Sequence, residues 1–299
     1  MPEDLIGKLL AENYPRQIAY VQKLIKSDIM SHSYCFVGSA EGAQNDFAIY
    51  FAAHLLCHKN CGQCKNCQAF QNNIHLDLKV IRSLNNQAIS LKQIQEGQKH
   101  LSVSPQLGQY RLLIIQDTEF LSLASANALL KTLEEPPKKS LIMLTTGRPD
   151  QLLKTVRSRT ATIILPKLPT KNLLNYQIST EEQKWIGGRF QRLVKLTAKN
   201  LDDFHTWQQD KEFWLEFIKN DTVQREKMVN DRFGSIKENR SLGKLLSTGL
   251  TNLEEVLQTL IQNGEEKSTK RLELIRILKT MLDDNVNVKM ILDYLIVII

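Results

Sequence analysis

Long hydrophobic runs are absent from this 299-residue chain. The apolar stretch Ile291–Ile299 covers only nine residues and includes Asp293 and Tyr294, whereas a membrane-spanning helix needs about 20 apolar residues. The segment Met1–Asp4 carries acidic residues where a secretory signal peptide would carry basic ones. We therefore expect a cytosolic protein in which Ile291–Ile299 belongs to a buried helix.

Glycine and proline are scarce, at 13 and 8 residues, which argues against a low-complexity or disordered chain. The length predicts two or three globular domains. Basic residues outnumber acidic ones, 39 against 32, but they are scattered and form no block of five or more. The net charge of +7 fits a polyanionic partner such as DNA and fits an ordinary solvated surface equally well.

Short apolar runs alternate with helical patterns in the first half of the chain. Because these runs are continuously apolar, they predict strands of a parallel sheet that is covered on both faces. We therefore expect an α/β domain over residues 1–167. The predicted strands are 34–37, 78–81, 111–115, 141–144 and 162–165, and the predicted helices are 45–56, 90–101, 123–135 and 151–157.

Pro166 and Pro169 mark the expected end of this domain, because the apolar spacing beyond them is helical throughout. We expect a small helical domain over residues 168–209 and a larger helical bundle over residues 210–299. Three aromatic residues at helical spacing are expected to lie in the core of the bundle: Phe213, Trp214 and Phe217.

Four of the five cysteines form the pattern C-x3-C-x2-C-x2-C: Cys57, Cys61, Cys64 and Cys67. Thiolates at this spacing can converge on a tetrahedral Zn²⁺ ion, which accepts soft sulfur ligands. Because four sulfur ligands leave no open position for substrate, we expect a structural zinc site. Disulfides and an iron-sulfur cluster are the alternatives. His54 and His58 are expected to be bystanders, and Cys35 a buried strand residue.

The segment Gly38–Asn45, with the sequence GSAEGAQN, lies between a predicted strand and a predicted helix, which is the setting of a phosphate-binding P-loop. Gly38 and Gly42 remain. The motif G-x-x-x-x-G-K-[ST], however, requires a second glycine, a lysine and a hydroxyl where this chain has Ala43, Gln44 and Asn45. Gln44 supplies no cation for the phosphates, and Asn45 is a poor substitute for the hydroxyl that binds Mg²⁺. A simple strand-to-helix turn is the alternative.

The strand predicted over residues 111–115 is followed by Gln116 and Asp117. A Walker-B strand would carry a magnesium-side carboxylate and then a catalytic base at these two positions. One acid of the pair is therefore missing. Two defects in one site predict that the chain hydrolyses no ATP and binds no nucleotide productively.

Four further segments resemble the bacterial clamp-loader subunits of the AAA+ superfamily, the gamma, tau and delta-prime group of DNA polymerase III. Residues 124–137, ASANALLKTLEEPP, are similar to a long signature of that group. Residues 141–146 resemble its sensor strand, residues 153–159 the segment that ends in a Ser-Arg-Cys motif, and residues 285–293 its C-terminal helix. Thr160 stands where the motif has cysteine, which leaves the arginine assignment intact.

This resemblance implies an AAA+ α/β domain with a zinc module at residues 57–67, a helical lid domain and a C-terminal collar domain that holds a ring of subunits together. A degenerate P-loop beside a four-cysteine module resembles the delta-prime branch, since intact loops belong to the gamma and tau ATPases. The implied partners are gamma or tau ATPase subunits, the delta subunit, the sliding clamp and primed DNA. The chain would be an accessory subunit of a DNA-directed DNA polymerase, a nucleotidyltransferase complex active in DNA replication, and no enzyme by itself.

Arg159 is the residue that the resemblance assigns as an arginine finger, which completes the ATP site of a neighbouring gamma or tau subunit. A guanidinium fork stabilises the charge that builds on the transferred phosphoryl group. The alternatives for Arg159 are a cap on a helix C-terminus or an ion pair with Asp150.

Two other functions stay open at this point. The chain could be an active P-loop ATPase of the gamma and tau type, with Lys59 or Lys65 replacing the missing lysine. It could also be a stand-alone zinc-containing DNA-binding protein, which the basic composition favours.

Overall fold

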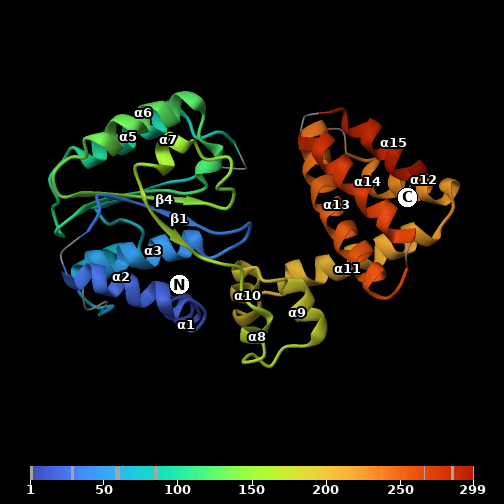
Figure 1. Ribbon diagram of the computed structural model, residues 1–299, viewed down its shortest axis with the longest axis horizontal. Coiled ribbons are helices and arrows are strands. Elements are labelled where there is room, and N and C mark those ends of the chain that lie inside the picture. The colour runs from blue at the N-terminus through green and yellow to red at the C-terminus, as the bar shows by residue number, and fades with distance from the viewer. Residues whose placement is uncertain are drawn as a thin grey trace. The chain divides into compact units, whose positions relative to one another are not determined.

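The computed structural model describes residues 3–27, 30–57, 61–83, 87–236, 238–265, 267–283 and 286–298 (Figure 1). The chain divides into two compact units, Met1–Lys199 and Asn200–Ile299. We call them the first unit and the second unit. Within the described ranges, no helix is both long and apolar enough to span a membrane.

The described part of the first unit contains a five-stranded parallel sheet with the strand order β2-β3-β4-β1-β5. Each strand lies where the apolar runs predicted it, so the parallel sheet expected from the sequence is confirmed. The strands are β1 (Ser33–Val37), β2 (Leu78–Ile81), β3 (Arg111–Ile115), β4 (Ser140–Thr146) and β5 (Ala161–Ile164).

Helices cover both faces of the sheet (Figure 1). All residues of β3 and β4 are buried, which explains why Leu112–Ile115 and Leu141–Leu144 are continuously apolar instead of alternating. One face carries α5 (Leu91–Leu101), α6 (Leu123–Glu134) and α7 (Lys154–Arg157), and the other carries α1 (Glu3–Asn13), α2 (Pro15–Ser27) and α3 (Gln44–Leu56).

Successive side chains of β1 enter different cores. Cys35 is fully buried in the aliphatic cluster that includes Leu113 and Leu129, and burial raises the pKa of its thiol to about 12. Phe36 packs against Phe47, with ring centroids 5.6 Å apart. The expectation that Cys35 is a buried strand residue is confirmed.

Two helix starts follow local side-chain chemistry, and one predicted helix is shortened. Ser90 caps α5 and Ser122 caps α6, each by accepting a hydrogen bond from a backbone N–H of the first turn. The helix predicted over residues 151–157 begins only at Lys154, because the Gln151 N–H bonds to the Arg148 carbonyl in a turn. Between β3 and α6 lies a short 3-10 helix, η1 (Thr118–Phe120).

The chain continues in helices beyond β5, as the apolar spacing predicted. Three short helices complete the first unit, so the expected boundary after Lys167 lies inside this unit. They are α8 (Thr170–Leu173), α9 (Thr180–Ile186) and α10 (Phe190–Thr197).

The described residues of the second unit are helical, and the unit begins earlier than expected. The proposed division after Gln209 falls inside a continuous helix, α11, in which Phe204, Trp207, Trp214 and Phe217 are all buried. The helices are α11 (Asp202–Lys219), α12 (Thr222–Phe233), α13 (Asn239–Gln262), α14 (Lys267–Asp283) and α15 (Val288–Ile298).

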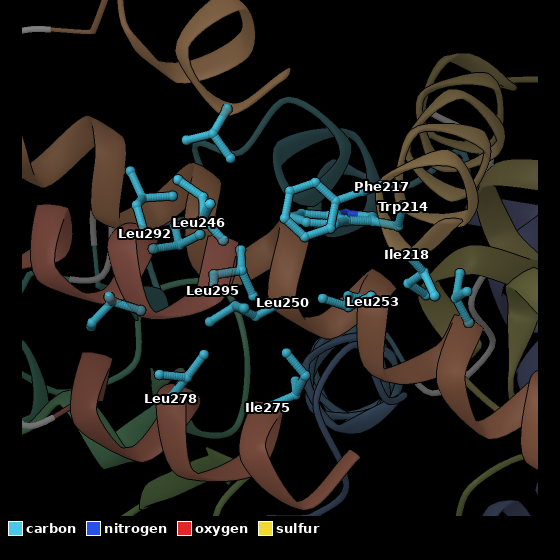
Figure 2. Packing of buried hydrophobic residues seen from close by; sticks show 14 of the residues in the cluster. Trp214, Phe217, Ile218, Leu246, Leu250, Leu253, Ile275, Leu278, Leu292 and Leu295 are labelled. Atoms are coloured by element: carbon cyan, nitrogen blue, oxygen red, sulfur yellow. The ribbon is translucent and has the colours of Figure 1, made fainter. Parts of the chain in front are cut away.

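Figure 2 shows the core of the second unit, where Trp214 and Phe217 meet leucine and isoleucine side chains of α13, α14 and α15. The rings of Trp214 and Phe217 lie edge to face with centroids 5.3 Å apart, and both residues are fully buried. Phe213 packs against the same cluster as a partly buried residue. The aromatic cluster is therefore core, as expected.

Candidate functional site

The loop after β1 is filled by one of its own side chains. Gln44 is only 4% exposed, and its Nε2 donates a hydrogen bond to the Ser39 carbonyl over 3.0 Å. A Cβ atom added at Gly38 would lie 2.1 Å from Gln44 Oε1, and one added at Gly42 would lie 2.5 Å from it. The Gln44 amide therefore occupies the inside of the loop, where a P-loop holds phosphate oxygens.

Asn45 and Asp117, which the sequence placed in one site, meet directly. Asn45 Nδ2 donates to Asp117 Oδ1 over 3.0 Å, and the Thr145 hydroxyl donates to Asn45 Oδ1. Thr145 Oγ1 in turn accepts from the Asp117 N–H over 3.1 Å. The carboxylate at the end of β3 is thus bonded to an amide of the chain itself, where an active site would present it to Mg²⁺.

Gln116 takes no part in this hydrogen-bond network. Its backbone N–H bonds to the Ile81 carbonyl over 2.8 Å, and the residue lines a neighbouring cavity of about 770 Å³ together with Asn45 and Tyr50. Of the two Walker-B-like residues named from the sequence, the structure brings only Asp117 into hydrogen bonding with Asn45.

Helix α10 is fastened to the loop through an acidic residue. The Glu41 carboxylate accepts a hydrogen bond from Arg192 Nε over 2.9 Å and lies 3.5 Å from Arg189 Nε. The Glu41 carbonyl accepts from the Gln191 N–H over 3.0 Å. Glu41 stands at a variable position of the motif, and its carboxylate is paired with these two arginines.

A second contact joins the same two elements. The Gln191 side chain donates a hydrogen bond to the carboxylate of Asp46, in the first turn of α3, and burial raises the pKa of Asp46 to about 6 despite this bond. The sequence reasoning did not identify Glu41, Asp46 or their partners on α10. An acidic residue inside a phosphate loop was the only sequence signal for them.

The four predicted metal ligands converge. Cys57 follows α3, Cys64 caps α4 (Lys65–Gln71), and the four Sγ atoms all lie within 4.8 Å of one another. The Cys57–Cys61 and Cys57–Cys64 Sγ distances are 3.9 and 3.7 Å. Tetrahedral Zn–S bonds of about 2.3 Å require sulfur atoms about 3.8 Å apart, so these four side chains fit a metal ion.

The environment of the sulfur atoms differs from one cysteine to the next. The N–H groups of Gln63 and Cys64 lower the pKa of the exposed Cys61 thiol to about 6, which favours the metal-binding thiolate. Burial raises the pKa of Cys67 to about 12, so a bound cation would have to drive its deprotonation.

His54 was considered as a metal ligand and Lys65 as a replacement for the missing P-loop lysine, and the structure supports neither role. His54 bonds through Nδ1 to the Tyr50 carbonyl, and its ring lies 4.1 Å from the Tyr50 ring at a tilt of 38°, as fits a bystander. Lys65 is exposed at the start of α4. His58 and Lys59 lie outside the described residues.

The cysteine cluster is linked to a buried ion pair of the sheet through the loop over residues 106–108. Asn66 of α4 donates to the carbonyls of Leu56 and Leu107. The fully buried Asp77 accepts three backbone N–H bonds from residues 106–108 and an Nη1 bond from Arg111 over 2.8 Å. Burial alone would raise the pKa of Asp77, but these donors hold it at about 2.

Arg159 lies at the opposite edge of the sheet from the loop. Its carbonyl accepts a hydrogen bond from the buried Ser33 hydroxyl over 2.7 Å, and Ser33 is the first residue of β1. The loop begins after Val37, the last residue of β1. Four residue steps of a strand separate the two edges by about 13 Å, so Arg159 is turned away from its own loop.

The side chain of Arg159 makes contacts within the chain. It pairs with Glu134 of α6, at 2.6 Å between Nη2 and Oε1, and its Nη1 donates to the Thr155 carbonyl over 2.9 Å. The ion pair considered from the sequence, with Asp150, is therefore replaced by one with Glu134. The contact with Thr155 is a cap on the short helix α7.

Comparisons with known proteins agree with this architecture. A family model described as "DNA polymerase III, delta subunit" matches residues 14–169. DNA polymerase III subunit delta' of Bacillus subtilis is 24% identical to this chain, and the match covers 98% of each. The subunit of the same name from Escherichia coli is 34% identical over 43% of this chain and 40% of its own.

A solved structure of similar fold extends the match to almost the whole length. The gamma subunit-related protein of Thermotoga maritima has a TM-score of 0.54 at 17% identity, over 94% of this chain and 97% of its own, which shows a shared fold. The expected architecture, a parallel-sheet domain followed by helices, is thus confirmed. Because the family model matches more than half of the residues, the chain belongs to the DNA polymerase III delta subunit family, and its relatives place it in the delta-prime group.

Proposed function

We propose that this chain is a non-hydrolysing clamp-loader subunit that supplies Arg159 to the ATP site of a neighbouring gamma or tau subunit. The observation that carries the proposal is that the filled loop and Arg159 lie at opposite ends of β1. The loop at the carboxyl edge of the sheet is filled by Gln44, while Arg159 is anchored at the amino edge through Ser33. A guanidinium so placed serves a nucleotide held by another subunit.

The filled loop supports the absence of ATP turnover by the chain alone. Gln44 brings no cation, and Asn45 bonds the carboxylate that would face Mg²⁺. ATP hydrolysis of the gamma and tau type would require at least Gln44 and Asn45 to give up these contacts. This arrangement favours an accessory role within the polymerase holoenzyme.

The proposal includes zinc as the resident metal of the cysteine cluster. Four sulfur ligands near tetrahedral spacing suit Zn²⁺ and leave it no open coordination position, so its role would be structural. The four cysteines would hold the ion as thiolates and thereby fix α4 against the end of α3.

The proposed setting is a cytoplasmic hetero-oligomer with gamma or tau subunits and the delta subunit. Through this complex the chain would act on the sliding clamp and primed DNA. The names of the relatives and the family model support this assignment. The helices α11–α15 would form the collar that holds the ring together.

The test is a reconstituted complex that contains Arg159→Ala. We expect normal assembly but lower DNA-stimulated ATP hydrolysis and clamp loading, because an arginine finger is worth about 10³ to 10⁵ in rate at the site that it completes. Arg159→Lys should be impaired too, because lysine lacks the planar fork. Arg157→Ala, which removes an exposed arginine from the same helix region, is the matched control.

Three results would count against the proposal. Full clamp loading by Arg159→Ala would refute the arginine finger. Sustained phosphate release by the purified chain would refute the non-hydrolysing role, and salt-sensitive duplex binding by the chain alone would favour a DNA-binding protein instead.

A further inference from the structure

The backbone of Arg159 is held rigidly at the start of β1. Its carbonyl accepts the 2.7 Å bond from Ser33, whose side chain is completely buried, and its N–H bonds to the Val156 carbonyl over 3.2 Å. Val156 is itself fully buried. The Cα atom of Arg159 therefore has a fixed position, and only the side-chain torsions decide where the guanidinium lies.

Contacts on both sides of the guanidinium restrict these torsions, and Glu134 supplies the charged one. Glu134 Oε1 accepts from Arg159 Nε over 2.9 Å and lies 2.6 Å from Nη2, while Nη1 donates to the Thr155 carbonyl on the other side. The guanidinium is thus gripped along one edge. Nη2 bears a second N–H that these contacts do not use, and the side chain is 35% exposed.

Glu134 sits on an equally fixed element. It is the last residue of α6, whose Leu129 and Leu133 are buried in the core below. The Leu133 carbonyl contacts the ring of His32 at 3.0 Å, next to the anchor of Arg159. Gln98 of α5 also donates to the Ala128 carbonyl, so α6 is held on two sides. Both partners of the ion pair therefore extend from backbones that do not depend on a bound nucleotide.

We infer that Glu134 is a positioning residue that sets the orientation of the Arg159 guanidinium before a neighbouring nucleotide is engaged. The inference rests on the proposed function of Arg159. Ordering a free arginine side chain costs conformational entropy, and a guanidinium already held in place engages a phosphoryl group without that cost. Because the pair is partly exposed, it is weak enough for a triphosphate to share or displace the arginine.

The chemistry of the contact suggests a sharp pair of variants. Both contacts from Arg159 converge on Oε1, and the amide oxygen of glutamine can accept both in the same geometry. Glu134→Gln should therefore keep the orientation, whereas Glu134→Ala leaves only the contacts of Nη1 and loosens it. Glu135→Ala is the matched control, because Glu135 is the adjacent exposed glutamate and its loss changes the net charge equally.

The first measurement is DNA-stimulated ATP hydrolysis and clamp loading by the reconstituted complex. Glu134→Ala should lower both roughly two- to fivefold, the range spanned by partly exposed ion pairs. Glu134→Gln and Glu135→Ala should stay near the unsubstituted level, and assembly and thermal unfolding should be unchanged in all three. In the Arg159→Ala background, Glu134→Ala should have no further effect, because Glu134 acts only through Arg159.

The second measurement needs no partner subunit. Nitrogen-15 spectra of the isolated chain report exchange of the arginine Nε–H with water, and the Arg159 signal is identified by its loss in Arg159→Lys. We expect exchange to be faster in Glu134→Ala, again by roughly two- to fivefold, and unchanged in Glu134→Gln. Equal exchange rates in all variants would overturn the inference.

The outcomes separate this inference from the function on which it rests. Full activity of Arg159→Ala would overturn both. Impaired Arg159→Ala with fully active Glu134→Ala would overturn the positioning role alone. Higher activity of Glu134→Ala and Glu134→Gln would also overturn it, because Glu134 would then withhold the arginine instead of presenting it.

Discussion

Gln44 stands where a P-loop has lysine, and its amide also occupies the inside of the loop. The sequence predicted the missing cation, because a lysine position holds an amide. It could not predict that this amide folds into the loop and bonds to the Ser39 carbonyl, since that depends on the side-chain rotamer. The contacts of Glu41 with Arg189 and Arg192 were equally hidden, because about 150 residues separate the partners in sequence.

Asp77 illustrates a residue whose ionisation stabilises the fold. Its pKa of about 2 in the folded chain lies below the ordinary aspartate value, so its contribution is complete above about pH 4 and is lost as the pH falls toward 2. A depression of about two units corresponds to about 2–3 kcal/mol. The ionised Asp77 stabilises the contact between the sheet and the loop over residues 106–108.

We predict that Asp77→Asn lowers the free energy of unfolding by about 3–5 kcal/mol at pH 7, because it leaves the buried Arg111 without its counter-charge. The deficit relative to the unsubstituted chain should shrink between pH 4 and pH 2. Urea unfolding at a series of pH values measures it. Glu96→Gln, which breaks the partly exposed pair with Lys79, should change stability by less than about 1 kcal/mol. A pH-independent deficit would show that Asp77 does not act through its charge.

At the scale of elements, the apolar pattern predicted β1, β3 and β4 well, because four or more consecutive buried residues in each leave little choice of position. The elements that it misplaced depend on longer-range packing. Residues 151–153 form a turn instead of the start of a helix, and Gln209 lies within α11, whose buried face continues from Phe204 to Phe217. Both units are helical on either side of their boundary at Lys199, so helical spacing alone does not show where the first unit ends.

Helix α13 contains two glycines with opposite roles. A Cβ atom at Gly249 would lie 2.8 Å from Trp214 Cζ2, whereas one at Gly243 would meet only Val288 Cγ2, at an ordinary 3.6 Å. Glycine within a helix costs about 1 kcal/mol relative to alanine. At Gly243 the glycine only lowers the stability of the helix. At Gly249 the missing side chain also leaves room for the ring of Trp214.

We predict that Gly243→Ala raises the free energy of unfolding by about 0.5–1 kcal/mol and that Gly249→Ala lowers it by about 1–3 kcal/mol. The two variants add the same methyl group to the same helix, so each is the control for the other. Thermal or urea unfolding followed by Trp fluorescence measures both. Equal effects of the two substitutions would contradict the packing described for Trp214.

At the scale of the whole molecule, the chain consists of two units with separate cores. The cysteine cluster belongs to the first unit and fastens α3, α4 and the loop before β3 through Asn66. The cysteine spacing was enough to predict the ligands. The supporting contacts could not be predicted, because Leu107 is distant in sequence and bonds through its backbone.

We predict about one zinc ion per purified chain, and a clearly lower zinc content in Cys61→Ser. Chelation should speed hydrogen exchange in residues 61–71 and 102–110 while α13 keeps its protection, because α13 has its own core. Cys35→Ser is the control, since it removes a buried thiol that is no ligand and should leave the zinc content unchanged. Iron-sulfur absorbance, or exchange that increases equally in both units, would contradict this.

Strand β1 carries the residues that precede the filled loop at one end and the hydroxyl that anchors Arg159 at the other. Substitutions in the loop after the carboxyl end of β1 can therefore leave the position of Arg159 at the amino end unchanged. If the proposed function holds, a chain with this layout can lose ATP hydrolysis at its own loop and still supply an arginine to the ATP site of another subunit.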